Sequence, residues 1–219
     1  MAGWVAPMSE ACQYLHDSLS QLPRLGREDL AKVPANGVYV LFEKGEGAHG
    51  GDRIVRIGTH RGQNNLAPRI REHLYTQNKD RSIFRKHVGR CLLARAQDPF
   101  LAHWEIDLTT TSARESNAHK IDMAKLKEVE NEVTRYMTGN FSFAVLSFGE
   151  QADRLRVEER LLSTIFCCKD CGPSETWLGK LHPKSAVIRS SGLWNVQGLK
   201  GPVLDPGEAR RMVDAGQSG

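Results

Sequence analysis

The sequence predicts a mixed α/β (α+β) domain with a small central mixed or antiparallel β-sheet flanked by helices. Two observations lead to this class. Runs of β-branched and aromatic residues, which are typical of strands, lie at 37–43, 53–58 and 141–148. Segments whose apolar residues repeat every three or four positions lie between and after those runs. With 219 residues, of which 40% are hydrophobic and 26% charged, the chain can bury a core, and the composition argues against a fibrous or wholly disordered protein.

The first half of the chain is expected to hold one helix before the first two strands and one after them. Residues 8–20 form the first helix in this prediction, and a turn-rich connector follows. The runs 37–43 and 53–58 pair as a hairpin around a glycine-rich loop that is longer than a tight turn. The next helix begins at LAPRIREHLY, directly after two asparagines that are suitable N-caps.

The second half is expected to add two helices and two strands. Alternating apolar residues in FLAHWEIDL (100–108) predict a strand. Helices are expected at about 119–137 and 153–168, on either side of the strand at 141–148. The last 20 residues are expected to be a loosely held tail. The chain then divides into an N-terminal helix and connector, a central domain with a helical and strand insertion at about 95–145, and a C-terminal tail: residues 1–33, 34–197 and 198–219.

The termini and the overall charge bear on where the protein works. No stretch approaches the roughly 20 apolar residues of a membrane helix, and the N-terminus lacks the pattern of a secretory signal. We therefore expect a cytoplasmic, intracellular protein with no membrane partner. The net charge is only +4 and the pI about 8.8, which permits a nucleic-acid partner without requiring one. The basic residues concentrate between Arg53 and Arg95.

Three of the five cysteines form a CCKDC cluster: Cys167, Cys168 and Cys171. Five is too few and an odd number for a disulfide framework. A zinc site would usually need a second CxxC or a Cys/His pair at matching spacing, and His182 is the nearest candidate. Reduced thiols at a helix end in a cytosolic protein are the favoured interpretation.

Glu158 does not fit the polar and apolar pattern of its helix. Leu155, Glu158, Leu162 and Ile165 recur at helical spacing, which places the carboxylate within an apolar stripe, whereas Glu159 projects toward the polar side. A carboxylate on a buried face is costly unless it is paired, hydrogen-bonded or bound to a metal. A structural salt bridge to an arginine is the plain alternative.

Three other residues stand out. Arg69 and His73 are four positions apart, so they share one helix face and could present a guanidinium and an imidazole to a phosphate. An ordinary solvated pair is the alternative. Tyr39 faces away from its strand neighbours Val38 and Val40, so it either lines a second packed face or uses its hydroxyl.

In combination, these residues and their order resemble the GIY-YIG nuclease family over residues 34 to 197. The first motif appears as Gly37-Val38-Tyr39 and the second as Arg56-Ile57-Gly58. The arginine and histidine of the next helix, the glutamate of a later helix and a final asparagine follow in order: Arg69, His73, Glu158 and Asn195. The ending Gly192-Leu193-Trp194-Asn195 is most similar to the restriction-endonuclease branch.

The resemblance implies a metal-dependent DNA endonuclease with a restriction-like, defence or repair role. It implies the catalytic set Tyr39, Arg56, His60, Arg69, His73, Glu158 and Asn195, with Glu158 holding Mg²⁺ (or Mn²⁺). In this set Tyr39 is the general base, Arg69 clamps the phosphate, and His73 assists proton transfer or orients Tyr39. Asn195 positions the phosphate or a water, and His60 is a further candidate for direct contact.

One departure from the family pattern and the plain interpretation of Glu158 leave two alternatives open. The family usually has tyrosine where this chain has Arg56, which we interpret as a phosphate contact. A catalytically degenerate member that only binds nucleic acid is the first alternative. The second is an α/β interaction protein whose Glu158 is simply salt-bridged.

The basic segment 80–98 is the expected DNA-backbone surface. Its candidate contacts are Arg81, Arg85, Lys86, His87 and Arg90. A solvated helix face is the alternative. Because cutting both strands takes two sites, DNA cleavage of this kind would favour a homodimer.

Overall fold

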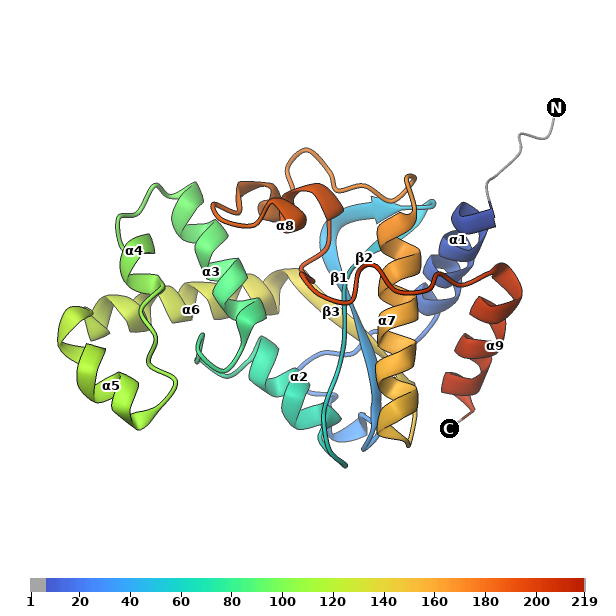
Figure 1. The fold of residues 1–219 in the computed structure, drawn as a ribbon, viewed down its shortest axis with the longest axis horizontal. Coiled ribbons are helices and arrows are strands. Elements are labelled where there is room, and N and C mark those ends of the chain that lie inside the picture. Colours follow the sequence, from blue (N-terminus) through green and yellow to red (C-terminus); the bar gives the residue numbers. More distant parts are fainter. Residues whose placement is uncertain (1–6, 219) are drawn as a thin grey trace.

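The computed structural model describes residues 7–218 and confirms the predicted class (Figure 1). Within these residues, three antiparallel strands form one sheet in the order β2–β1–β3. The strands are β1 (Gly37–Ala48), β2 (Gly51–Thr59) and β3 (Phe141–Ser147). β1 is therefore central, and β2 and β3 are the two edge strands.

The hairpin between β1 and β2 is tighter than expected. Both strands continue through the glycine-rich segment, with a register shift on the way, until Ala48 pairs with Gly51. His49 and Gly50 form the turn, and both have positive φ, at 52° and 82°. Positive φ at both central positions defines a type I′ turn, whose twist matches that of the flanking strands. The expectation of a long loop was wrong because its glycines belong largely to the strands.

Helices make up most of the remaining described chain. The α-helices are α1 (Pro7–Ser20), α2 (Leu66–Leu74), α3 (Ile83–Arg95), α4 (Leu101–Trp104), α5 (Thr111–Asn117), α6 (Met123–Asn140), α7 (Gln151–Cys167), α8 (Ala186–Ser191) and α9 (Pro206–Gln217). Short 3₁₀ turns lie at Leu30–Lys32, Ala118–Lys120 and Leu178–Leu181. The helices expected at 8–20, at LAPRIREHLY, at 119–137 and at 153–168 correspond to α1, α2, α6 and α7.

The sheet has a hydrophobic core on each face. Tyr39, Leu41 and Val55 point to one face and pack with residues of α2, α3 and α6. Val38, Val40 and Ile57 point to the other face and pack with α1, α7 and α9. The alternation along β1 thus serves two packed faces, as the opposite orientation of Tyr39 had indicated.

The strand expected at 100–108 is not present. This segment begins with the short helix α4, in which Phe100 and Trp104 are buried while Ala102 and His103 are exposed. A spacing of four between the buried residues is helical, and it coincides with the alternation that suggested a strand. The Asp98 carboxylate accepts the Phe100 amide at 2.8 Å, and the Trp104 indole donates to the Lys86 carbonyl at 3.0 Å.

The C-terminal residues are not a loose tail. α9 begins with a capping box in which Asp205 and Glu208 bond each other's backbone amides. Ala209 and Val213 on this helix are fully or almost fully buried against α1 and β3. Figure 1 shows α9 standing beside α1 at one end of the molecule.

None of the helices described between residues 7 and 218 combines the length and the apolar character that a membrane crossing requires.

Candidate active site

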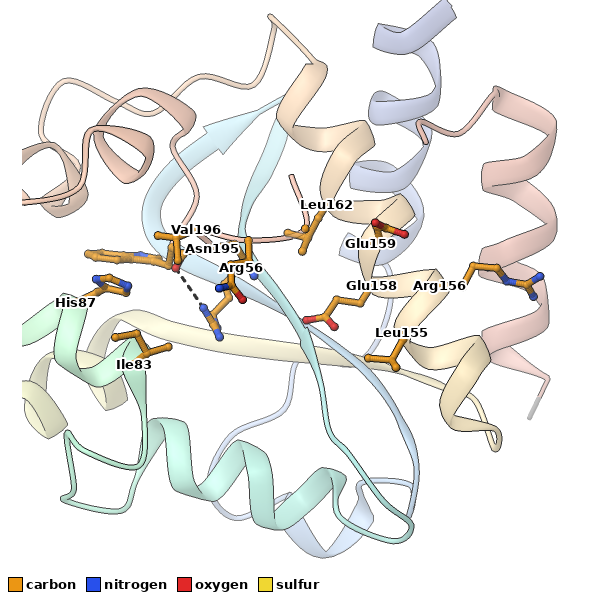
Figure 2. A pocket seen from close by; sticks show the side chains of 13 residues that line it. Arg56, Ile83, His87, Leu155, Arg156, Glu158, Glu159, Leu162, Asn195 and Val196 are labelled. Atoms are coloured by element: carbon orange, nitrogen blue, oxygen red, sulfur yellow. Dashed lines mark hydrogen bonds between the residues drawn. The ribbon is translucent and has the colours of Figure 1, made fainter. Parts of the chain in front are cut away.

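A cavity of about 580 Å³ lies at the outer edge of β2, between α7 and α3 (Figure 2). Four segments line it. They contribute Arg56 of β2, Ile83 and His87 of α3, Leu155, Arg156, Glu158, Glu159 and Leu162 of α7, and residues 194–198 of the segment that follows α8. Three residues of the expected catalytic set, Arg56, Glu158 and Asn195, therefore share one cavity.

A β-bulge turns the Arg56 side chain toward this cavity. Leu41 pairs with Arg56 and Phe42 with Ile54, so Val55 is an extra residue on β2. The Arg56 guanidinium lies 4.8 Å from the centre of the Phe84 ring and donates to the Trp194 carbonyl at 3.2 Å. Its Nε is buried without a hydrogen-bond partner among residues 7–218. The guanidinium thus keeps one donor unpaired among the described residues.

The residues after α8 cover the free edge of β2. The Trp194 amide donates to the Val55 carbonyl at 2.8 Å. The Asn195 side chain then accepts the Ile57 amide at 3.1 Å and donates to the Ile57 carbonyl at 2.8 Å. Asn195 lines the cavity, but its amide oxygen and nitrogen both hold the strand that carries Arg56.

Glu158 and Glu159 face different surroundings, although they are neighbours. In Figure 2 the Glu158 carboxylate points across the cavity toward Arg56, whereas Glu159 points away along the helix. Glu158 is partly buried, and no salt bridge involves it within the described part of the chain. The alternative of a simply salt-bridged Glu158 is therefore wrong. Leu155, which we expected in the same apolar stripe, is 42% exposed and lies at the cavity rim instead.

The surroundings of Glu158 disfavour its charged form. Burial raises the pKa of this carboxyl, and the Arg56 guanidinium, the Thr59 backbone and Arg69 oppose that rise. A bound cation would relieve the cost of the buried negative charge. Glu158 thus has the properties expected of a metal ligand.

Tyr39 lies behind the cavity and explains two motif glycines. Its phenol packs directly over Gly58 on the neighbouring strand, where a β-carbon would come within 2.2 Å of the phenolic oxygen. A β-carbon on Gly37 would likewise come within 2.1 Å of the Leu146 carbonyl on β3. The Tyr39 hydroxyl is buried and has no hydrogen-bond partner in residues 7–218. Both glycines are therefore required by close approach, while the Tyr39 hydroxyl is enclosed and Tyr39 is not among the residues that line the cavity.

His73 and Arg69 come from α2, next to Tyr39. The rings of His73 and Tyr39 have centroids 6.0 Å apart, and His73 Nδ1 lies 2.7 Å from the Ser82 hydroxyl. Burial, together with Arg56, Arg69 and Arg85, lowers the pKa of His73 well below its usual value. The imidazole is therefore neutral at pH 7. Arg69 is partly exposed and pairs with Glu72 at 2.5 Å.

His60 follows β2 and is also buried. Neither of its ring nitrogens has a hydrogen-bond partner within the range 7–218. Burial and the nearby Arg154 lower the pKa of His60. Arg154, which the sequence analysis missed, is fully buried and donates to the carbonyls of Gly62, Phe148 and Gly149. It precedes Glu158 by one helical turn, and that spacing was the available signal.

The basic residues expected on a DNA-binding face are mostly committed inside the protein. Arg85 is fully buried and pairs with Glu130 of α6 at 2.6 Å, so its expected position at the surface was wrong. Arg90 pairs with Glu105, and Lys86 lies near Asp80. Arg81 alone of the five has a mostly exposed side chain, at 69%.

His87 is the member of that basic set that reaches the cavity. Its Nδ1 lies 2.8 Å from Nε2 of His182, and its Nε2 is buried without a partner in the described chain. Burial and His182 lower the pKa of His87 to about 3. The ring is therefore neutral at pH 7 and offers a hydrogen bond rather than a charge.

Apolar side chains surround the polar centre of the cavity. Ile83, Leu155 and Val196 are 47%, 42% and 39% exposed, and all three line the cavity. Exposed apolar side chains gathered around a polar site suit contacts with a partner's non-polar groups.

The sequence and structure were compared with known protein families, curated proteins and solved structures. The family model described as GIY-YIG domain matches residues 8–210, which include both motif strands, α7 and Asn195. Comparisons with curated proteins and with solved structures gave no match. The matched range also includes α1 and the start of α9, which lie outside the central domain expected from the motifs. A GIY-YIG domain indicates a nuclease, and a match over most of the chain leads to one conclusion: the chain belongs to the GIY-YIG family.

Proposed function

We propose that this protein is a metal-dependent endonuclease that hydrolyses DNA phosphodiester bonds in the cavity at the edge of β2. One observation carries the proposal above all. Glu158, a carboxylate without a salt bridge in the described residues, faces the Arg56 guanidinium across a single cavity. A carboxylate can hold a cation and an arginine can bind a phosphate, and metal-dependent phosphodiester hydrolysis uses both kinds of charge.

The donor set suits a hydrated magnesium or manganese ion held by Glu158. Two carboxylates, Glu158 and Glu159, line the cavity, and Glu158 is the one directed at Arg56. Mg²⁺ commonly binds through one or two carboxylates and keeps its other positions for water and phosphate. When bound, the ion supplies Lewis-acid stabilisation of charge on the phosphate.

The chain's own residues would then orient the phosphate and move the protons. Arg56 donates to a phosphate oxygen through the side of the guanidinium that the Trp194 carbonyl does not occupy. Arg69 of α2 adds positive charge close enough to influence Glu158. Tyr39 accepts a proton from the attacking water while its own phenolic proton passes to the neutral His73 beside it.

DNA is the proposed substrate, and the apolar cavity rim would contact its sugars and bases. We propose that Arg81, with its exposed side chain, contributes to backbone contacts next to the cavity. A restriction-like, defence or repair role and a homodimer that cuts both strands remain parts of this proposal.

Two features favour a second candidate function, a GIY-YIG-like protein that binds nucleic acid without cutting it. Arg56 occupies the place of the second motif tyrosine, and the Tyr39 hydroxyl is buried rather than open to the cavity. In this case Arg56 and Arg69 would hold a phosphate, but no group would activate water.

The test is incubation of the purified chain with supercoiled and linear DNA, with Mg²⁺, Mn²⁺ or EDTA. We expect cleavage that requires the metal, is lost in Glu158→Ala and is kept in Glu159→Ala. DNA binding without cleavage in the wild type, weakened in Arg56→Gln, would favour the second function. No binding and no cleavage under any metal condition would refute both.

A further inference from the structure

Four potential metal ligands from distant parts of the sequence meet at the C-terminal end of α7. Cys12 comes from α1, His49 from the β1–β2 turn, and Cys168 and Cys171 directly follow α7. One donor atom from each lies within 4.8 Å of all the others. In Figure 1 this is the upper end of α7, where α1 and the hairpin turn approach it.

The separations between the donor atoms match a tetrahedral zinc centre. The Sγ atoms of Cys12 and Cys171 are 3.6 Å apart, and Cys168 Sγ lies 3.5 Å from His49 Nε2. Zn–S bonds of about 2.3 Å and Zn–N bonds of about 2.0 Å at tetrahedral angles give S–S and S–N separations of about 3.8 and 3.5 Å. Both measured separations agree with those values to within a few tenths of an ångström.

The backbone brings each donor to this place. His49 adopts φ 52° in the type I′ turn, a conformation that asparagine or glycine usually takes. The Cys171 thiol lies 3.4 Å from the Ile165 carbonyl, and the Ser9 hydroxyl joins α1 to Asp170 between the two cysteines. The turn brings His49 Nε2 next to the Cys168 thiol, so the hairpin presents an imidazole to the cysteines.

The neighbouring histidine has another role. His16 Nε2 accepts the Ile54 amide at 3.2 Å, and its Nδ1 lies 3.0 Å from the Cys12 carbonyl. Both ring nitrogens are therefore engaged with the backbone. The fourth ligand is His49, and not His16 or the more distant His182.

We propose that Cys12, His49, Cys168 and Cys171 bind one Zn²⁺ ion in a structural Cys₃His site, separate from the cavity of Glu158. Three thiols lose their protons to solvent on binding, and the imidazole binds as the neutral ring. Four protein ligands complete a tetrahedral shell and leave no position for a substrate, which is typical of structural rather than catalytic zinc. The ion would join α1, the β1–β2 turn and the C-terminal end of α7. The turn leads into β2, which carries Arg56, and α7 carries Glu158.

The test is elemental analysis of the full chain, purified without a polyhistidine tag or chelator. We expect about one zinc per chain, with Cys168→Ser and His49→Gln losing most of it. Cys167→Ser is the matched control, because Cys167 adjoins Cys168 but contributes no ligand. Glu158→Ala should also keep its zinc, so this result does not depend on nuclease activity.

A second measurement, made on the wild type, tests the proposal even if the ligand variants fail to fold. Wild-type protein exchanged into Co²⁺ should show the absorption of a tetrahedral thiolate site, and Cys167→Ser should show the same spectrum. Wild type that contains no zinc as purified and takes up none from added Zn²⁺ would overturn the proposal. An intact mass showing a Cys12–Cys171 disulfide would overturn it as well.

Discussion

Glu158 is more costly to the folded protein than its neighbour Glu159, because it is partly buried without a salt-bridge partner among the described residues. Its raised pKa means that stability is fully present below the ordinary pKa of the carboxyl and is lost as the pH rises through the folded pKa. Glu158→Gln should therefore stabilise the metal-free protein at pH 7. We expect a higher Tm than that of the wild type, because the variant removes the cost of a buried, unpaired carboxylate.

Thermal unfolding in EDTA at several pH values checks this. The gain should shrink toward zero below about pH 4, where the wild-type carboxyl is protonated in both states. Glu159→Gln, on the exposed side of the same turn, should change Tm little at any pH. Equal effects of the two variants, or a loss of stability in Glu158→Gln, would mean that the Glu158 carboxylate is satisfied in the fold.

The Tyr39 hydroxyl, like the Glu158 carboxylate, lowers the stability of the fold although it is proposed to act in catalysis. It is buried and unpartnered in residues 7–218, and leaving such a group unpaired costs about 1–3 kcal/mol. Tyr39→Phe keeps the packing over Gly58 and should leave the free energy of unfolding unchanged or raise it. If Tyr39 is the general base, the same variant should lower the cleavage rate by roughly 10²–10⁴-fold. Urea unfolding and single-turnover cleavage measure the two effects, and full activity in this variant would remove Tyr39 from the mechanism.

On the scale of single elements, α3 shows how a basic sequence can form a core helix. Arg85 donates to the Glu130 carboxylate and carbonyl and to the Thr134 hydroxyl. Arg85→Met would leave Glu130 buried without its cation, which should cost about 3–5 kcal/mol in the free energy of unfolding. Arg81→Gln, at the exposed side chain, should cost less than about 0.5 kcal/mol.

Urea denaturation of both variants and of the double variant Arg85→Met/Glu130→Gln tests this pairing. The double variant should recover part of the loss, since it removes the uncompensated carboxylate. No recovery would mean that the contacts to Thr134 and the neighbouring carbonyls, rather than the ion pair, hold α3 to α6.

The elements predicted most accurately were those whose apolar residues repeat with one clear period, either that of a strand or that of a helix. β3 and α7 have clear alternating and helical patterns, and both lie within a few residues of the predicted bounds. The segment 100–108 satisfied both periods at once, and the chain forms the short helix α4 there, after a turn in which the Asp98 carboxylate accepts the Phe100 amide. α9 was not predicted because its sequence shows only a capping box and then a few apolar positions separated by polar residues.

For the site, motif order identified residues that the fold does bring to one cavity, namely Arg56, Glu158 and Asn195. Sequence could not show that the Asn195 amide is engaged with the Ile57 backbone, because that contact joins positions 138 residues apart. The ligating position of His49 was equally hidden, since it depends on where a hairpin turn meets the end of α7. Long-range contacts of this kind are set by packing and not by local spacing.

At the scale of the whole molecule, the site lies where two separately packed halves meet. α2, α3 and α6 cover one face of the sheet, and α1, α7 and α9 cover the other. The cavity takes Glu158 from one group of helices and Ile83 and His87 from the other, with Arg56 between them. Its geometry therefore depends on how both helical layers are held to one three-stranded sheet.

α9 provides a direct test of this dependence, because none of its described residues lines the cavity. It packs on α1 and β3, in the layer that contains α7, and its Val213 is 1% exposed. Val213→Ala should lower the free energy of unfolding by roughly 2 kcal/mol, from two lost methyl groups and the cavity that they leave. Truncation before Pro206 should cost more, since the Ala209 contacts are lost as well.

Arg211→Ala, at an exposed position of the same helix, is the control. If the truncated chain unfolds at the wild-type temperature, the layer of α1 and α7 is stable without α9, and the C-terminal residues are dispensable for the site.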